Sequence, residues 1–179
     1  MLQRIVIVGT SGSGKSTLAR DLATCLRLSH IELDALHWDA DWQAPPHEAF
    51  IERVQGAMDN APVGWTMDGN YSMSQAITWP RADTLIWLDY PRHIVMWRIT
   101  LRTIRRVFTR QELWNGNRES FRNAFASKDS MILWAYNTYQ RNRQRYSAVF
   151  TSDHHPHLTM IRFTHPRQTE AWLKALASP

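Results

Sequence analysis

The chain has 179 residues, of which 44% are hydrophobic, so it is long and apolar enough for about one domain with its own core. It holds a single cysteine, Cys25, and no run of 18 apolar residues, which excludes a disulfide framework and a membrane-spanning helix. The net charge of +5 is unevenly distributed, because residues 1–91 carry 6 basic and 11 acidic side chains whereas residues 92–145 carry 12 and 3.

A glycine-rich loop separates the first predicted strand, residues 5–8, from the first predicted helix, which begins near Lys15. Its spacing, G-x-x-x-x-G-K-S, is that of a phosphate-binding loop, in which glycines let successive amide N–H groups turn toward an anion. Lys15 is placed to reach the β- and γ-phosphates and to serve catalysis, and Ser16 to ligate Mg²⁺. The alternative is a glycine-rich turn that binds no ligand, but such a turn would not require all nine residues to match the phosphate-loop pattern. The residues expected to hold the nucleotide are Gly9, Thr10, Ser11, Gly12, Ser13, Gly14, Lys15, Ser16 and Thr17.

Residues 28–34 alternate like a second short strand that ends on Asp34. Because ligands collect beyond the carboxyl ends of parallel strands, Asp34 is a candidate for substrate contact or general base; the alternative is a cap for the next helix. Residues 35–46 indicate an irregular binding loop, in which Trp38 and Trp42 either stack on a flat ligand or pack. A metal site on the histidine and aspartates of this loop is not favoured, since their spacing fits no helix face. A helix is predicted over residues 47–60.

The third predicted strand, residues 65–71, contains Asp68-Gly69. A carboxylate there, beside the phosphate loop, is expected to hold the water shell of Mg²⁺, although Asp-Gly is also a common turn pair. Asn70 and Tyr71 could then face a substrate. The fourth predicted strand, residues 81–89, has a continuous apolar centre, as expected of a strand buried on both faces.

From Arg92 the periodicity becomes helical, and Arg98 and Arg102 share one face. After a looser, polar stretch a second basic helix is predicted over residues 131–146. Of the 21 basic residues 18 are arginine, whose planar fork grips phosphate oxygens. We therefore predict an arginine-rich helical lid, with a lid-like insertion at about 103–130. The alternative is a basic surface that is simply solvated. The far side of the lid offers Arg141, Arg143 and Arg145, of which Arg141 is taken as the catalytic candidate.

Residues 149–157 are predicted to be a surface loop; its three histidines invite a metal hypothesis, but a plain loop is favoured. Residues 158–163 are the fifth predicted strand, and residues 169–177 a final helix capped by Thr169. No repeat or linker interrupts the chain, so one domain over residues 1–179 is expected. An apolar strand follows the first residues directly, which predicts a cytoplasmic protein without a signal peptide.

The loop at 9–17, followed by Asp34, Asp68-Gly69, Asp89-x-Pro91 and the two arginines 98 and 102, resembles the adenylate-kinase-like P-loop kinases and ATPases. Within them, residues 33–38, 68–71 and 113–119 resemble the small ATPases known as DNA topology modulation proteins. The resemblance implies a three-layer α/β P-loop NTPase fold with a five-stranded parallel sheet in the order 2-3-1-4-5. It also implies ATP and Mg²⁺ on the loop.

For individual residues, the resemblance implies that Asp68 lies near the metal, Arg98 near the ATP base, and Arg102 on the transferring phosphate. Nucleotide kinases read Asp-Gly-Phe-Pro-Arg at the third strand, whereas this chain reads Asp68-Gly69-Asn70-Tyr71. That departure argues against a nucleoside monophosphate as the acceptor.

The sequence thus predicts an ATP-dependent phosphotransferase with a small-molecule acceptor, in which Asp34 orients or deprotonates the acceptor hydroxyl. One rival is a nucleic-acid-associated ATPase, suggested by the basic segment and the tryptophans. Another is a nucleotide-binding regulator with negligible turnover. We expect a monomer or homodimer that contacts no membrane.

Overall fold

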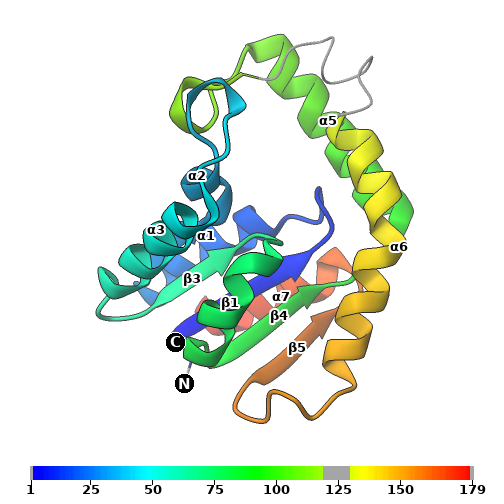
Figure 1. Ribbon diagram of the computed structural model, residues 1–179. Coiled ribbons are helices and arrows are strands. Elements are labelled where there is room, and N and C mark those ends of the chain that lie inside the picture. Colours follow the sequence, from blue (N-terminus) through cyan, green and yellow to red (C-terminus); the bar gives the residue numbers. More distant parts are fainter. Residues whose placement is uncertain (1, 119–129, 178–179) are drawn as a thin grey trace.

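Five parallel strands form the sheet at the centre of the protein (Figure 1), whose computed structural model describes residues 2–118 and 130–177. The strand order is β2-β3-β1-β4-β5, which confirms the predicted order and the α/β P-loop fold. Each neighbouring pair is parallel and in continuous register. The strands are β1 (Arg4–Gly9), β2 (Ser29–Glu32), β3 (Trp65–Asp68), β4 (Thr84–Leu88) and β5 (Thr159–Phe163).

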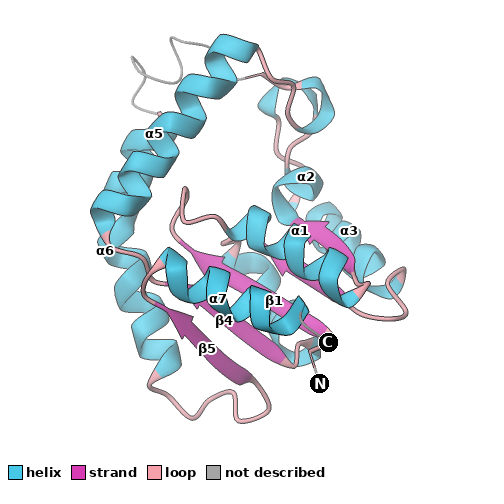
Figure 2. Cartoon of the chain, turned by 180° about the vertical axis from the view of Figure 1, so that it is seen from behind, coloured by secondary structure: helices cyan, strands magenta, loops and turns pink. Residues whose placement is uncertain are grey.

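Helices cover both faces of the sheet, which gives the three-layer arrangement seen from behind in Figure 2. α1 and α7 lie on one face, and α3, η3 and the C-terminal part of α6 pack on the other. The α-helices are α1 (Lys15–Leu26), α2 (Leu33–His37), α3 (His47–Asp59), α4 (Gln75–Thr78), α5 (Arg92–Thr109), α6 (Met131–Phe150) and α7 (Pro166–Ala177). Short 3-10 turns are η1 (Ala40–Trp42), η2 (Ser72–Ser74), η3 (Trp79–Arg81) and η4 (Trp114–Gly116).

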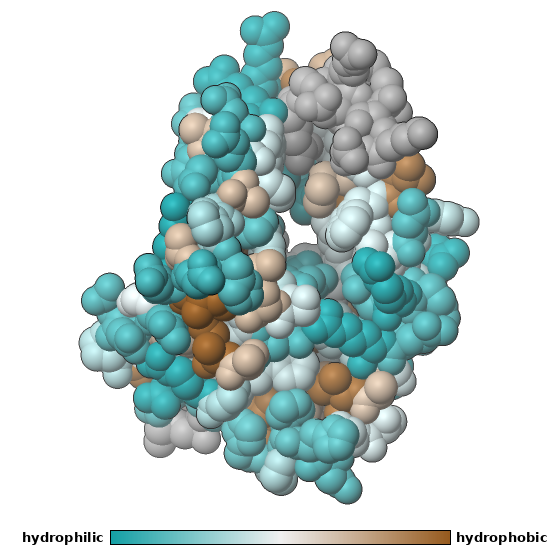
Figure 3. Space-filling model, viewed as in Figure 1, coloured by the Kyte–Doolittle hydropathy of each residue, from teal (hydrophilic) through white to brown (hydrophobic). Residues whose placement is uncertain are grey.

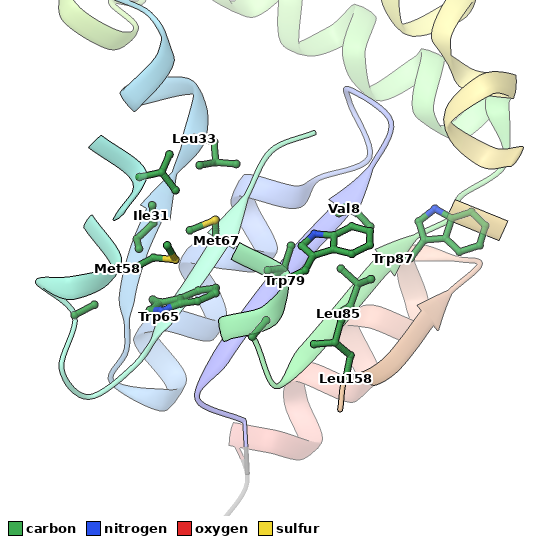
Figure 4. Close-up of a cluster of buried hydrophobic side chains, with 14 of the residues drawn as sticks. Val8, Ile31, Leu33, Met58, Trp65, Met67, Trp79, Leu85, Trp87 and Leu158 are labelled. Atoms are coloured by element: carbon green, nitrogen blue, oxygen red, sulfur yellow. The ribbon is translucent and has the colours of Figure 1, made fainter. Parts of the chain in front are cut away.

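Alternation along the buried strands divides the core into two clusters. On β1, Ile5 and Ile7 face α1 and α7, while Val6 and Val8 face the other side, because successive strand residues point to opposite faces. The cluster that contains Val6 and Val8 also holds Trp65 and many of the other large side chains drawn in Figure 4. Burial of this apolar surface on both faces fixes the sheet beneath the loops at its carboxyl edge.

Local predictions were wrong at β2 and α7, and one region was not predicted. β2 ends at Glu32, and Asp34 lies in the first turn of α2, where its carbonyl accepts an i→i+4 bond from the Trp38 amide at 3.1 Å. Thr169 does not cap α7, which begins at Pro166; the threonine is buried inside the helix, and its hydroxyl lies 2.6 Å from that of Tyr90. The short helices between residues 72 and 81 had no sequence signal that we recognised.

Two long helices rise from one side of the sheet and pack against each other, α5 with α6 (Figure 1). The buried carboxylate of Asp89 anchors the base of this pair, since it binds Arg143 of α6 at 3.0 Å and Arg162 of β5 at 2.5 Å. The predicted lid-like insertion begins within α5, and its residues 119–129 lie outside the described part of the chain. Among the helices that the structure describes, none is both long and apolar enough for a membrane crossing.

Candidate functional site

The glycine-rich loop turns the chain sharply from β1 into α1. Its glycines at 9, 12 and 14 have φ of 148°, 88° and 100°, a region that side chains disfavour. A Cβ on Gly12 would lie 2.7 Å from the Cβ of Ile99 and 3.0 Å from the Val95 carbonyl oxygen, so glycine also permits the close approach of α5. Asn70 holds the start of the loop, donating from Nδ2 to the Gly9 carbonyl at 2.6 Å. The loop therefore leads directly into the positive N-terminal end of α1.

Lys15 stands at that end, and its Nζ donates to the Thr10 carbonyl at 3.3 Å. Desolvation lowers the pKa of Lys15, Asp68 and Asp34 act to raise it, and Arg102 lowers it. Ser13 Oγ is buried without a hydrogen-bond partner in the described structure. A desolvated ammonium and an unsatisfied hydroxyl beside a turn of backbone amides fit a bound phosphate chain, which would satisfy both.

Asp68 is fully buried at the end of β3 and is held from two sides. Ser16 Oγ donates to its Oδ2 at 2.5 Å, and His30 Nε2 lies 2.7 Å from its Oδ1. Sequence reasoning missed His30, although the register offers a signal: Glu32 pairs with Asp68, and His30 lies two residues earlier on the same face of β2. A serine hydroxyl and a fixed carboxylate are a donor set that suits Mg²⁺.

Lys15, Ser16 and Asp68 line one cavity of about 480 Å³ beside the loop. Figure 3 shows the molecule hollowed at its centre, between the α2 side and the α5–α6 side. Arg98 reaches back to the loop, donating to the Ser13 carbonyl at 3.2 Å, and its guanidinium lies 5.5 Å from the ring centre of Tyr90. Of the predicted site residues, those lining the cavity are Ser11, Gly12, Ser13, Gly14, Lys15, Ser16, Thr17, Asp34, Asp68, Arg98 and Arg102.

The far-side arginines are placed differently. Arg141 is exposed on α6 and is not among the described residues that line the cavity. Arg143 is bound to Asp89, and Arg145 donates to Gln75 Oε1 at 2.6 Å. The entry of Arg141 into the site therefore stays a prediction.

Asp34 faces the same cavity from α2, and Tyr71 holds it. The Tyr71 hydroxyl donates to Asp34 Oδ1 at 2.7 Å, and the ring of His37 packs on that of Tyr71 with centroids 4.5 Å apart. Burial raises the pKa of Tyr71, and the neighbouring Asp34 charge raises it further, so the hydroxyl remains a donor. This bond occupies Oδ1 and fixes the orientation of the carboxylate.

A comparison with protein families decides what kind of domain this is. A family model described as an AAA domain matches residues 5–178, which include the loop, the sheet and every cavity-lining residue named above. The chain belongs to the AAA-domain family. This AAA domain is thus a P-loop nucleotide-binding protein of the kinase or ATPase type. A search of curated proteins gave no match, so the narrower resemblance to topology modulation proteins stays a prediction.

In this AAA domain the segment after α2 crosses to the segment after α5 and closes a bridge above the cavity (Figure 1). Asn117 is 5% exposed and joins the two: its Oδ1 accepts from the Trp42 amide at 2.9 Å, and its Nδ2 donates to the Asp39 carbonyl at 2.8 Å. Asn115 donates to the Trp38 carbonyl at 2.5 Å. These bonds connect segments more than 70 residues apart in the sequence.

Aromatic packing completes the bridge. The ring of Trp42 lies between those of Trp38 and Trp114, at centroid distances of 5.7 and 6.3 Å. Trp38 and Trp42 therefore pack on one another, while Trp114 lines the cavity and lies 5.9 Å from the guanidinium of Arg106. Of the loop's aspartates, Asp39 is paired with Arg53, and the His37 ring packs among aromatic side chains. Among the residues described, no three His, Cys, Asp or Glu side chains gather as a metal site.

Tyr71→Phe removes only the hydroxyl that orients Asp34. We expect a loss of about 1 kcal/mol in the free energy of unfolding and a fall of about tenfold in the rate of ATP turnover, because the carboxylate is no longer fixed. Chemical denaturation and single-turnover assays measure the two effects. The control is Tyr136→Phe on the exposed face of α6, and equal turnover rates in the two variants would contradict the orienting role.

Asn117→Ala should open the bridge while leaving the sheet intact. The change leaves the Trp42 amide and the Asp39 carbonyl without their partner, which costs about 2 kcal/mol locally and raises hydrogen exchange there about 30-fold. Exchange measured by mass spectrometry should rise at residues 38–43 and 113–117 but not in α1. Asn137→Ala, at an exposed position on α6, is the matched control. Unchanged exchange at the Trp42 amide would contradict the role of Asn117.

Proposed function

We propose that this AAA domain is an ATP-dependent phosphotransferase that moves the γ-phosphoryl group of ATP to a hydroxyl of a small-molecule acceptor. One observation carries the proposal: the oriented carboxylate of Asp34 lines the same cavity as Lys15 and the Ser16–Asp68 pair. A domain that only bound nucleotide would need no second carboxylate, held by a partly buried tyrosine, beside the phosphate loop.

The transfer makes one bond and breaks one. The acceptor oxygen forms a bond to the γ-phosphorus while the bond from that phosphorus to the β–γ bridging oxygen breaks, and ADP leaves with the electron pair. The acceptor's hydroxyl proton passes to Asp34, whose Oδ1 is held by Tyr71 and whose Oδ2 is the oxygen we assign to the proton. Because little covalent chemistry falls to the protein, positioning and charge neutralisation supply most of the acceleration.

The loop and α5 hold the triphosphate in this proposal. Backbone amides of residues 11–16 and the ammonium of Lys15 bind its β- and γ-phosphate oxygens. Arg102 stabilises the charge on the transferring group, and Arg98, against Tyr90, lies beside the base. Ser16 and Asp68 are the residues that would hold Mg²⁺, which neutralises phosphate charge when bound, and His30 keeps the Asp68 carboxylate in place.

Titration calorimetry with Mg²⁺ and a non-hydrolysable ATP analogue tests the nucleotide site, and we expect one site per chain. ATP consumption is then measured with and without mixtures of hydroxylated metabolites, where an acceptor should increase turnover and appear as a phosphorylated product. A protein that binds no purine triphosphate, or whose turnover rises only with added DNA, would contradict the proposal. The latter result would favour the nucleic-acid-associated ATPase.

A further inference from the structure

The two sides of the cavity carry opposite charge. Residues 28–80, which supply the β2, α2 and β3 side, include 8 acidic side chains and 1 arginine. Residues 92–118, on the α5 and η4 side, include 7 arginines and 1 acidic side chain. ATP is an anion, and of the four described arginines that line the cavity, Arg98, Arg102 and Arg106 come from the second side and Arg20 comes from α1. We therefore assign the acceptor to the first side, which carries Asp34.

The single arginine of the acidic side is already engaged. Arg53 Nη1 donates to Asp39 Oδ1 at 2.9 Å and to the Leu36 carbonyl at 3.0 Å, and its Nη2 donates to Asp39 Oδ2 at 3.2 Å. Arg53 is not one of the described residues that line the cavity. Burial lowers the pKa of His37, which favours its neutral form, and His30 is bound to Asp68. The acidic side therefore offers no cation that could receive a phosphate or carboxylate of the acceptor.

Three carboxylates of this side line the cavity; Asp68 is held by Ser16 and His30, which leaves Glu32 and Asp34 for the acceptor. Glu32 ends β2, and Asp34 follows it in the first turn of α2. Carboxylates accept hydrogen bonds from hydroxyl and ammonium groups, whereas they repel an anion in a partly desolvated cavity. Trp114 lines the same cavity and presents a flat apolar surface to a ring.

We infer that the acceptor is a hydroxylated small molecule without negative charge, such as an uncharged sugar or nucleoside or an amino sugar, and that Glu32 and Asp34 select against phosphorylated and carboxylated analogues. The inference rests on the proposed phosphotransferase function and names the substrate class of that site. Glu32 accepts a hydrogen bond from a second hydroxyl or from an ammonium of the acceptor. Asp34 receives the proton of the hydroxyl that is phosphorylated.

The test uses matched pairs that differ by one phosphate: glucose and glucose 6-phosphate, uridine and uridine monophosphate, glycerol and glycerol phosphate, with glucosamine as the cationic member. Thermal shift with Mg²⁺ and the ATP analogue, and ATP consumption with Mg²⁺ and ATP, are measured for each compound at equal concentration. We expect the uncharged or cationic member of at least one pair to give the larger shift and at least tenfold faster ATP consumption than its phosphorylated partner. A preference for the phosphorylated members, or no difference within any pair, would overturn the inference.

A charge variant examines the mechanism of the selection. Glu32→Gln should reduce the discrimination between members of the preferred pair by about tenfold, because one like charge is removed while the side chain keeps its shape. Glu52→Gln, at an exposed position on α3, should leave it unchanged. Failure of the proposed function is recognised separately, since no member of any pair would then increase ATP consumption above the rate without an acceptor. A shift with the analogue but equal discrimination in Glu32→Gln and the parent would remove Glu32 from the selection.

Discussion

Lys15→Ala should lower the rate of ATP turnover by at least about 10³-fold. Its ammonium stands at the N-terminal end of α1, and its desolvation and its bond to the Thr10 carbonyl keep it at the mouth of the loop. No other lysine lies among the described residues that line the cavity, and Arg102 approaches from α5 rather than from the loop. Charge that develops on the transferring group would therefore lose the one lysine among the described residues that line the cavity.

Lys15→Ala should change the rate of ATP turnover much more than the thermal stability of the protein. The substitution removes a desolvated ammonium that makes a long hydrogen bond, of 3.3 Å, to the Thr10 carbonyl, so the ligand-free variant should be at least as stable as the parent in thermal unfolding. Lys15→Arg should not restore turnover, since the guanidinium fork is larger and differently shaped than an ammonium. Lys174→Ala, at an exposed position on α7, is the control. Parental turnover in Lys15→Ala would remove the loop from the chemistry and, with it, the proposed function.

The parts of the fold that the sequence predicted are those set by local patterns. The run at residues 5–8 with the glycine-rich loop defined β1 and α1, because spacing, glycine positions and apolar period agree there. The helix over residues 47–60 and the apolar centre of β4 followed from the same rules. The strand order did not follow from pattern, since register and neighbours are long-range properties; it came from a family resemblance.

The contacts that orient the site could not be predicted, because each depends on two segments far apart in the sequence. His30 contacts Asp68 because of the register between β2 and β3. Tyr71 contacts Asp34 because β3 ends at Asp68, three residues before Tyr71. The bridge depends on left-handed backbone at Trp42 and Asn115, with φ of 57° and 52°. Asparagine tolerates that region, which gives a weak signal at Asn115, but tryptophan gives none.

Asp34→Asn should spare ATP binding and stop transfer. Asparagine keeps the size of the side chain and an oxygen that can accept from the Tyr71 hydroxyl, so the local packing should survive. It cannot take a proton from an alcohol, and general-base catalysis contributes about 10²- to 10⁴-fold. We therefore expect kcat to fall by that factor, while the dissociation constant of the ATP analogue changes by less than about twofold, because Asp34 contacts the acceptor side.

The comparison with Tyr71→Phe separates the roles of Asp34. If Asp34 acts as a base, Asp34→Asn should lose far more activity than Tyr71→Phe, which keeps the carboxylate but frees its orientation. If Asp34 only binds the acceptor, both variants should raise KM and leave kcat near the parental value. Asp59→Asn, an exposed aspartate on α3 paired with Arg81, controls for the loss of one acidic charge. Equal transfer rates in Asp34→Asn and Asp59→Asn would exclude Asp34 from proton transfer, and the acceptor hydroxyl would then lose its proton to the phosphate itself.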